Sequence, residues 1–149
     1  AVTPILLGVM AVQGFEPALA AGGLGGYAAL GICLAVAVFA KNSGDKATAG
    51  SAAFTNALCG ITEPGLYGII LRSKWLLGTM VFSGAAAGLV FGIGGVAATN
   101  FAFTGILAFS GWLGCVKFPM YCVGIVVAIA LGFGITAFLL KSGKVKEYN

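Results

Sequence analysis

The sequence predicts an all-α polytopic membrane protein with spanning helices and one re-entrant helical hairpin, in a single transmembrane domain over residues 1–149. Three observations support this fold class. Hydrophobic residues make up 60% of the 149 residues and charged residues only 8%, whereas a soluble domain carries about 25% charged residues. The mean hydropathy is +1.06. The few charges stand in short groups between long apolar runs, as in the loops of membrane proteins.

The same composition argues against a soluble domain, a disordered chain and a nucleic-acid-binding protein. The net charge is only +4 and the chain contains no histidine, so it supplies no histidine general base, metal ligand or phosphate carrier. The four cysteines lie in or beside apolar segments without a CxxC spacing, and we interpret them as small buried hydrophobic residues. We therefore expect no catalytic residue, metal or cofactor in this chain.

Intervals without charged residues indicate where the chain crosses a membrane, since a spanning helix needs about 20 apolar residues. These intervals are residues 17–40, 75–116 and 118–140. The first and third each predict one spanning helix. The second is twice as long and contains glycines and Asn100 in its middle, so it predicts a span over 75–96 and a shorter or re-entrant helix over 101–114. Residues 2–14 are apolar but short and predict a half-helix.

Residues 47–71 have a different character. A moderately apolar stretch, ATAGSAAFTNALCG, is followed by ITEPGLYGIILRSK, and neither half is long enough to cross a bilayer. Two half-length helices that meet at a turn form a re-entrant hairpin, which is tolerated where protein buries it or where it lines a wet cavity. Such a hairpin places three basic groups on the cytoplasmic side. These groups are Lys41 with Lys46, Arg72 with Lys74, and Lys141 with Lys144 and Lys146, with Lys117 as the exception.

Polar residues near these loops have structural interpretations. Asp45, in the turn KNSGDK, is expected to cap a helix or to lie in a solvated loop. Trp75 and Trp112 are expected at span ends, where tryptophan anchors a protein at the membrane interface. Tyr148 and the basic tail are expected to form a solvated cytoplasmic end.

Glu63 is the residue with the clearest functional signal. A carboxylate at membrane depth costs a few kcal/mol or more, so it marks a substrate or ion path by default. Pro64 suits the first position of a new helix, Thr62 or Glu63 is its expected N-cap, and Gly60 suits the end of the preceding half-helix. Broken helices of this kind form mid-membrane binding sites in transporters. The alternative is that Glu63 only caps its helix.

The residue types around Glu63 favour a neutral polyol as the ligand. A carboxylate accepts two neighbouring hydroxyl protons, which suits a polyol better than an anion. Asn56, Thr62 and Tyr67 add donors, acceptors and an aromatic face, although each of them serves equally well as a packing residue. Glu63, Thr62, Gly60, Pro64, Asn56 and Tyr67 are therefore the candidate substrate-binding residues.

The string GITEPGLYG resembles the ITEP motif of the membrane IIC component of bacterial phosphoenolpyruvate-dependent sugar phosphotransferase systems. The resemblance is to the glucose and β-glucoside/sucrose/trehalose branch, where GITEPALYGV is typical. The matching residues are Gly60, Ile61, Thr62, Glu63, Pro64, Leu66, Tyr67 and Gly68, and Gly65 replaces the usual alanine. The stretch VTPILLGVMAVQGFEPALAA and the helix ending AVFAKNSGDK also resemble that branch, so the likeness covers most of residues 2–96.

This resemblance implies a multi-pass permease of the bacterial inner membrane that binds a sugar and carries it across. The motif glutamate, here Glu63, hydrogen-bonds the sugar hydroxyls, with Gly60, Thr62 and Pro64 shaping the site. The implied partners are the sugar, the lipid bilayer and the IIB and IIA phosphotransferase domains, and either a homodimer partner or a missing N-terminal half. A IIB domain performs the phosphorylation, and members of the branch are about twice as long, so this chain looks like a C-terminal transport portion.

Two alternatives belong to other functional classes. A truncated, non-transporting membrane protein packs against a full-length permease or another subunit, with Gly84, Gly88 and Gly92 as its contact. Such small-residue rows let membrane helices approach closely, and packing inside this chain explains them too. The second alternative is a cation-coupled carrier in which Glu63 relays protons.

Overall fold

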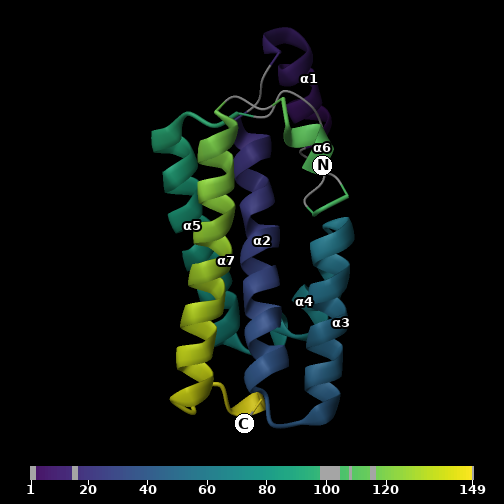
Figure 1. Ribbon diagram of the computed structural model, residues 1–149, viewed down its shortest axis with the longest axis vertical. Coiled ribbons are helices and arrows are strands. Elements are labelled where there is room, and N and C mark those ends of the chain that lie inside the picture. Colours follow the sequence, from purple (N-terminus) through teal and green to yellow (C-terminus); the bar gives the residue numbers. More distant parts are fainter. Residues whose placement is uncertain (1–2, 15–16, 98–104, 108, 115–116, 149) are drawn as a thin grey trace.

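The computed structural model describes residues 3–14, 17–97, 105–107, 109–114 and 117–148. Within these ranges the regular structure is helical, without a β-strand (Figure 1). The α-helices are α1 (Thr3–Gln13), α2 (Pro17–Phe39), α3 (Ser43–Cys59), α4 (Glu63–Gly68), α5 (Lys74–Gly94), α6 (Phe109–Trp112) and α7 (Phe118–Lys141). Two short 3-10 helices are η1 (Ile70–Arg72) and η2 (Lys146–Tyr148). The all-α prediction is confirmed.

Three helices are long and apolar enough to cross a membrane: α2 through its stretch Gly22–Phe39, α5 and α7. They coincide with the predicted spans over residues 17–40, 75–96 and 118–140 to within two residues at each end. The 21 residues of α5 rise about 31 Å, close to the roughly 30 Å of a bilayer's hydrocarbon core. The predicted half-helix over residues 2–14 is α1. The protein is therefore an all-α membrane protein.

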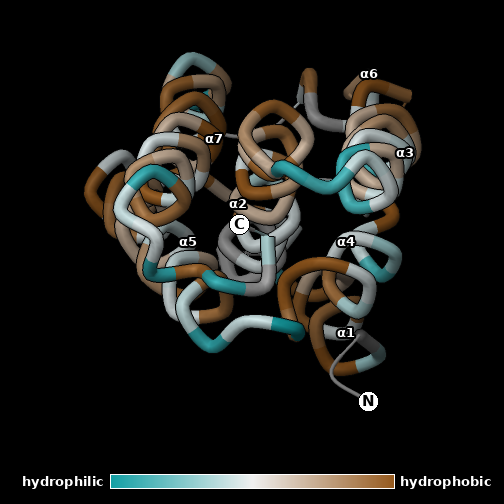
Figure 2. Tube along the Cα trace, turned by 90° about the horizontal axis from the view of Figure 1, so that it is seen from below, coloured by the Kyte–Doolittle hydropathy of each residue, from teal (hydrophilic) through white to brown (hydrophobic). Residues whose placement is uncertain are grey.

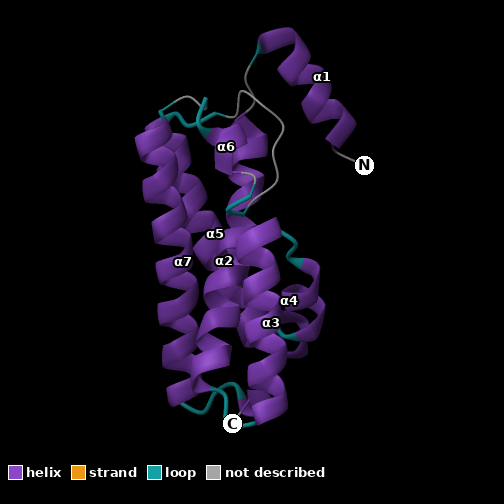
Figure 3. Cartoon of the chain, turned by 45° about the vertical axis from the view of Figure 1, so that its right-hand side comes forward, coloured by secondary structure: helices purple, strands orange, loops and turns teal. Residues whose placement is uncertain are grey.

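Helix α2 is the central element of the bundle and packs against α3, α5 and α7 (Figure 3). Two glycines bring α2 and α7 into close contact. A Cβ atom on Gly31 would lie 2.5 Å from the carbonyl oxygen of Ile129, and one on Gly132 would lie 2.7 Å from that of Ala28. Because each glycine faces the backbone of the other helix, a larger residue at either position would force the helices apart.

The glycine row that the sequence singles out contributes less to this packing. Of Gly84, Gly88 and Gly92, only Gly84 approaches another helix, with 3.9 Å between its added Cβ and Gly25 of α2. Gly88 and Gly92 have no neighbouring atom within 4 Å of such a Cβ among the described residues. Packing within the described part of the chain therefore accounts for Gly84 and not for the other two.

Members of the three basic groups predicted on one side of the membrane, Lys41, Arg72 and Lys144, lie at one end of the bundle, which we call the basic end. Figure 2 views the bundle from this end. The backbone N–H of Lys41 donates to the carbonyl of Tyr148 at 3.1 Å. The Arg72 guanidinium stands 5.2 Å from the centre of the Tyr148 ring, and Lys144 stands 5.4 Å from that of Trp75. The loops before α3 and before α5 therefore meet the C-terminal segment.

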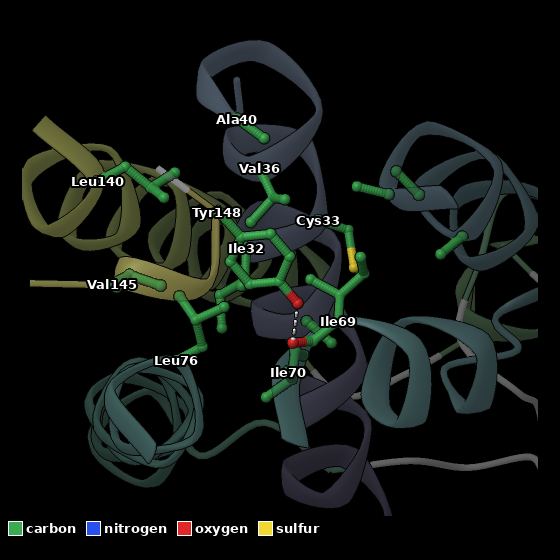
Figure 4. Close-up of a cluster of buried hydrophobic side chains, with 14 of the residues drawn as sticks. Ile32, Cys33, Val36, Ala40, Ile69, Ile70, Leu76, Leu140, Val145 and Tyr148 are labelled. Carbon is green, nitrogen blue, oxygen red and sulfur yellow. Dashed lines mark hydrogen bonds between the residues drawn. The ribbon is translucent and has the colours of Figure 1, made fainter. Parts of the chain in front are cut away.

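The expectation of a solvated Tyr148 is wrong. Tyr148 is 1% exposed and Val145 is fully buried, and the Tyr148 hydroxyl donates to the carbonyl of Ile69 at 2.6 Å (Figure 4). The ring packs among aliphatic side chains from α2, η1 and α5, including Ile32 and Leu76 (Figure 4). The tail folds back because its aromatic ring and Val145 gain more from burial than from exposure to water. The lysines of the tail remain exposed.

Asp45 is not the cap of α3. Asn42 is the N-cap, and its side chain accepts from the N–H of Gly44 at 2.9 Å. Asp45 lies in the first turn and pairs with Arg72 at 2.8 Å. The hydrogen bond to Asp45 raises the pKa of the Arg72 guanidinium above its usual value, so Arg72 stays charged. This pair joins the start of α3 to the end of η1.

Residues 43–72 therefore leave the basic end through α3 and return to it through α4 and η1 (Figures 1 and 3). The predicted shorter helix over residues 101–114 is described only in part, as α6, and Asn100 lies outside the described residues. The buried-cysteine interpretation holds for Cys33 but not for Cys59, which is exposed; Cys122 is half-buried and Cys115 lies outside the described residues.

Candidate functional site

The candidate residues gather at the turn between α3 and α4, which we call the tip and define as residues 56–67. Helix α3 ends at Gly60, whose φ of 72° is left-handed and whose N–H donates to the Asn56 carbonyl at 2.8 Å. Glycine adopts this conformation without the strain that a Cβ would cause, so the predicted break is confirmed. Thr62 occupies the N-cap position of α4 but makes no side-chain cap bond, and Pro64 lies in the first turn.

Helix α4 is short. It ends at Gly68, and Ile70 begins the separate 3-10 helix η1. The change from α to 3-10 geometry brings Ile69 and Ile70 into the buried cluster at the basic end (Figure 4). The returning half of the hairpin is therefore anchored by its own end.

One face of α4 is open. Glu63 and Tyr67 are four residues apart and so lie on the same helix face. Both are exposed, Tyr67 to 68%. Pro64 is also exposed, whereas Thr62 and Gly60 are half-buried. Within the part of the chain that the structure describes, the Glu63 carboxylate and the Tyr67 hydroxyl have no hydrogen-bond or ion-pair partner. Glu63 therefore does not cap α4 with its side chain.

The other face of α4 packs closely on α2. Gly65 is buried, and a Cβ atom placed on it would lie 2.7 Å from the Sγ atom of Cys33 and 3.7 Å from the Cβ of Ala52. Cys33 itself is fully buried. Position 65 is where this sequence departs from the ITEP motif, and the sulfur atom occupies the space that an alanine methyl would need.

Asn56 ties the tip to the middle of α2. Its side chain is 3% exposed, and its amide nitrogen donates to the carbonyl of Gly26 at 2.9 Å. Asn56 is therefore directed at α2 rather than at the open face where Glu63 and Tyr67 lie, and its role as a sugar ligand stays a prediction.

A segment distant in the sequence covers the end of α3, and no local pattern in the sequence predicts this contact. The N–H of Ile106 donates to the Ala57 carbonyl at 2.7 Å, and that of Leu107 donates to the Leu58 carbonyl at 3.1 Å. The last carbonyls of a helix have no partner within the helix, so these two bonds complete its end. Gly105 allows the approach, since a Cβ there would lie 2.6 Å from the Gly60 nitrogen.

Two buried tyrosines connect this covering segment to the bundle. The Tyr27 and Tyr121 hydroxyl oxygens are 3.3 Å apart, and the N–H of Gly105 donates to Tyr27 at 3.4 Å. Next to Tyr27 is a cavity of about 260 Å³, lined by largely apolar residues of α2, α3 and α7 together with Gly105, Ile106 and Phe109. The polar side chains of this region are thus used inside the fold, in contrast to Glu63 and Tyr67.

The tip can accept hydrogen bonds with a carboxylate and offer an aromatic ring beside it. No group of three His, Cys, Asp or Glu side chains within the described residues is arranged to hold a metal ion. The charges of the basic end are spread over other loops, and Arg72 is engaged by Asp45. A carboxylate and an aromatic ring on one open helix face suit recognition of a neutral, hydroxyl-rich molecule.

Curated relatives match most of this chain. The β-glucoside-specific EIIBCA component of the PTS system of Bacillus subtilis (strain 168) is 33% identical over 144 residues, which are 94% of this chain and 23% of that protein. The sucrose-specific EIIBC component of the same organism is 34% identical over 119 residues, 78% of this chain and 25% of that protein. The arbutin-, cellobiose-, and salicin-specific EIIBC component of Escherichia coli (strain K12) is 35% identical over 105 residues, 70% of this chain and 22% of that protein.

The chain spans about a quarter of the length of these relatives. No protein-family model matches it, and no solved structure matches it significantly. The relatives nevertheless agree with the resemblance carried by the GITEPGLYG motif, and the three apolar helices fit a permease component. The chain therefore belongs with the membrane IIC components of the sugar phosphotransferase systems, in the glucose, β-glucoside and sucrose branch.

Proposed function

We propose that this chain binds a sugar at the tip and carries it across the bacterial inner membrane for phosphorylation by a IIB partner. The observation that carries the proposal is the Glu63 carboxylate, which is exposed on the open face of α4 without a partner in the described part of the chain. Glu63 accepts two sugar hydroxyls, Tyr67 contacts the ring, and Thr62 adds a hydroxyl. Gly60 and Pro64 set the turn that presents them.

The position of the tip supports a re-entrant hairpin. Gly65 packs on Cys33, six residues or about 9 Å before the end of α2 at Phe39, and Asn56 bonds Gly26, about 20 Å before that end. Half of a hydrocarbon core of about 30 Å is about 15 Å. If the end of α2 at Phe39 lies at the membrane surface, the tip lies near the midplane, where broken helices form transporter sites.

The names of the relatives set the substrate class to test. They are specific for β-glucosides, for arbutin, cellobiose and salicin, and for sucrose. All these compounds are neutral and rich in hydroxyl groups, in agreement with a carboxylate acceptor and no basic side chain among the tip residues. IIB and IIA domains are part of the relatives' names, and we propose them as the partners that supply the phosphoryl group.

Titration calorimetry with cellobiose, salicin and sucrose on the purified chain in detergent tests this function. Glu63→Gln is expected to weaken binding of the recognised sugar by about tenfold or more, because a hydrogen bond to a charged group contributes about 1.5–3 kcal/mol. Asp45→Asn is the matched control, since it also neutralises one carboxylate on the same hairpin but at its base. Unchanged affinity in Glu63→Gln, or an equal loss in both variants, would contradict the proposal.

A second candidate function has one observation in its favour. Gly88 and Gly92 of α5 face open space, as a contact surface for another membrane subunit would. In this alternative the chain packs against a full-length permease and does not bind sugar itself. A chain that binds none of the three sugars but co-purifies with a full-length permease, and loses it when Gly88 is replaced by leucine, would favour this alternative.

A further inference from the structure

A groove opens between α5 and α7 at the basic end of the bundle. It has a volume of about 580 Å³. Its apolar wall comes from Gly78 and Phe82 of α5 and from Ile135 and Leu139 of α7, and Lys74 and Trp75 form its mouth. It lies on α5 and α7, apart from the tip on α3 and α4, so the proposed sugar site does not account for it.

The groove has the depth of one membrane leaflet. From Lys74 to Phe82 the helix advances eight residues, about 12 Å, and one leaflet of a hydrocarbon core of about 30 Å is about 15 Å. Thr79, the polar residue of the wall, donates its hydroxyl to the Trp75 carbonyl at 2.9 Å. The wall therefore offers no hydroxyl that would penalise an acyl chain.

The mouth of the groove is positively charged. Lys74 is the first residue of α5, and the N-terminus of a helix carries a partial positive charge. Ser73, at the N-cap, makes no side-chain cap bond. Lys144 reaches over the Trp75 ring at 5.4 Å from its centre. Among the described residues neither lysine forms an ion pair, whereas Arg72 nearby is engaged by Asp45.

The spanning helices α5 and α7 are less covered by the described chain than α2 is. Only 28% of the α5 span and 33% of the α7 span is buried, compared with 56% for α2. Trp75 at the mouth is 45% exposed, as expected of a tryptophan that meets the headgroup region. The occupant of the groove must therefore be apolar along one leaflet and anionic at its surface.

We propose that this groove binds an anionic glycerophospholipid. Its phosphate lies between Lys74, Lys144 and the N-terminus of α5, its glycerol lies at the Trp75 ring, and one acyl chain follows the wall to Phe82. Charge complementarity selects the lipid: a zwitterionic headgroup would bring a cation to the two lysines, and an apolar protein segment would leave both lysines without counter-ions.

Native mass spectrometry of the purified chain tests the proposal. The chain is released from detergent micelles that contain equal amounts of phosphatidylglycerol and phosphatidylcholine with the same acyl chains. We expect retention of phosphatidylglycerol over phosphatidylcholine, and a loss of about fivefold in that preference for each of Lys74→Gln and Lys144→Gln, since each lysine near an anionic surface contributes a comparable factor. Lys46→Gln, at the same end but outside the groove, should keep the preference.

A second pair of variants tests the groove rather than the charge. Gly78→Leu fills it, because a Cβ on Gly78 meets nothing within 4 Å, and should abolish retention without affecting folding. Gly134→Leu is the matched control, as this exposed glycine lies at a similar depth on α7, outside the groove, and has equally open space. Equal retention of the two lipids would overturn the proposal, and this is the result expected if a protein segment fills the groove instead. The proposal would also fail if Lys46→Gln lost as much lipid preference as Lys74→Gln, or if Gly134→Leu lost as much lipid retention as Gly78→Leu.

Discussion

The two ends of the α3–α4 hairpin differ in how their polar side chains are used. At the base, Asp45 pairs with Arg72 at 2.8 Å, and the Tyr148 hydroxyl donates to Ile69 at 2.6 Å. At the tip, Glu63 and Tyr67 lie exposed on one helix face with no partner in the described part of the chain. The polar groups at the base thus stabilise the fold, whereas those at the tip are available to a ligand.

The tip is nevertheless well anchored through its backbone. Gly60, Ile106 and Leu107 satisfy the Asn56, Ala57 and Leu58 carbonyls at the end of α3. The buried face of α4 is held separately by its contact with α2. Side chains presented by an ordered backbone bind a ligand without an additional cost for ordering the segment. Variants that act on one end only can therefore separate folding from ligand binding.

The largest effect on stability is expected at the buried face of the tip. Gly65→Ala would bring a methyl group to 2.7 Å from the Cys33 sulfur, and overpacking of this kind costs about 1–3 kcal/mol. We expect about 2 kcal/mol lower free energy of unfolding, measured by denaturant titration in detergent with tryptophan fluorescence. In a double variant, Cys33→Ala should make room for the methyl group, so that Gly65→Ala lowers the free energy of unfolding much less than it does when Cys33 is present.

Gly50→Ala is the control for this experiment. Gly50 lies in α3 and has nothing within 4 Å of an added Cβ, so the substitution should raise stability by up to about 1 kcal/mol through helix propensity alone. If Gly65→Ala changed the free energy of unfolding no more unfavourably than Gly50→Ala, α4 would not pack on Cys33. The claim that the buried face of α4 stabilises the tip would then be contradicted.

A pair of tyrosines makes the comparison directly. Tyr148→Phe removes a buried hydroxyl and leaves the Ile69 carbonyl without that donor, so we expect a loss of about 1–2 kcal/mol in the free energy of unfolding. Tyr67→Phe removes an exposed hydroxyl without a partner and should leave stability unchanged. In calorimetry the order reverses: Tyr67→Phe weakens sugar binding and Tyr148→Phe does not. Equal effects of the two variants on stability would contradict the distinction between base and tip.

Much of the architecture is predictable from local properties of the sequence. Spans follow from apolar length, and the hairpin break follows from Gly60 and Pro64, whose conformational preferences act within one turn. The burial of Tyr148 and the close approach of α2 to α7 at Gly31 and Gly132 depend on which helix faces lie together, which hydropathy alone does not determine. The contact at the tip follows a more specific rule. The last carbonyls of α3 need hydrogen-bond donors from outside the helix, and Gly105, in the next uncharged stretch, is a residue that lets a backbone come close enough to supply them.

The smallest effect is expected at the base, where Asp45→Asn removes the ion pair with Arg72. The Arg72 side chain is 47% exposed and the Asp45 side chain 13%. A pair at the surface is worth about 0.2–1 kcal/mol, and the loss should shrink at high salt because salt screens such pairs. Arg72→Gln should cost more, since it also removes the cation–π contact with Tyr148 at 5.2 Å. Unfolding titrations of both single variants and the double variant at low and high salt separate these contributions. Asp45→Asn could instead lower the free energy of unfolding as much as Tyr148→Phe does. The Asp45–Arg72 pair would then stabilise the base as strongly as a buried hydrogen bond, and Glu63 would be the only carboxylate of the hairpin that does not contribute to folding.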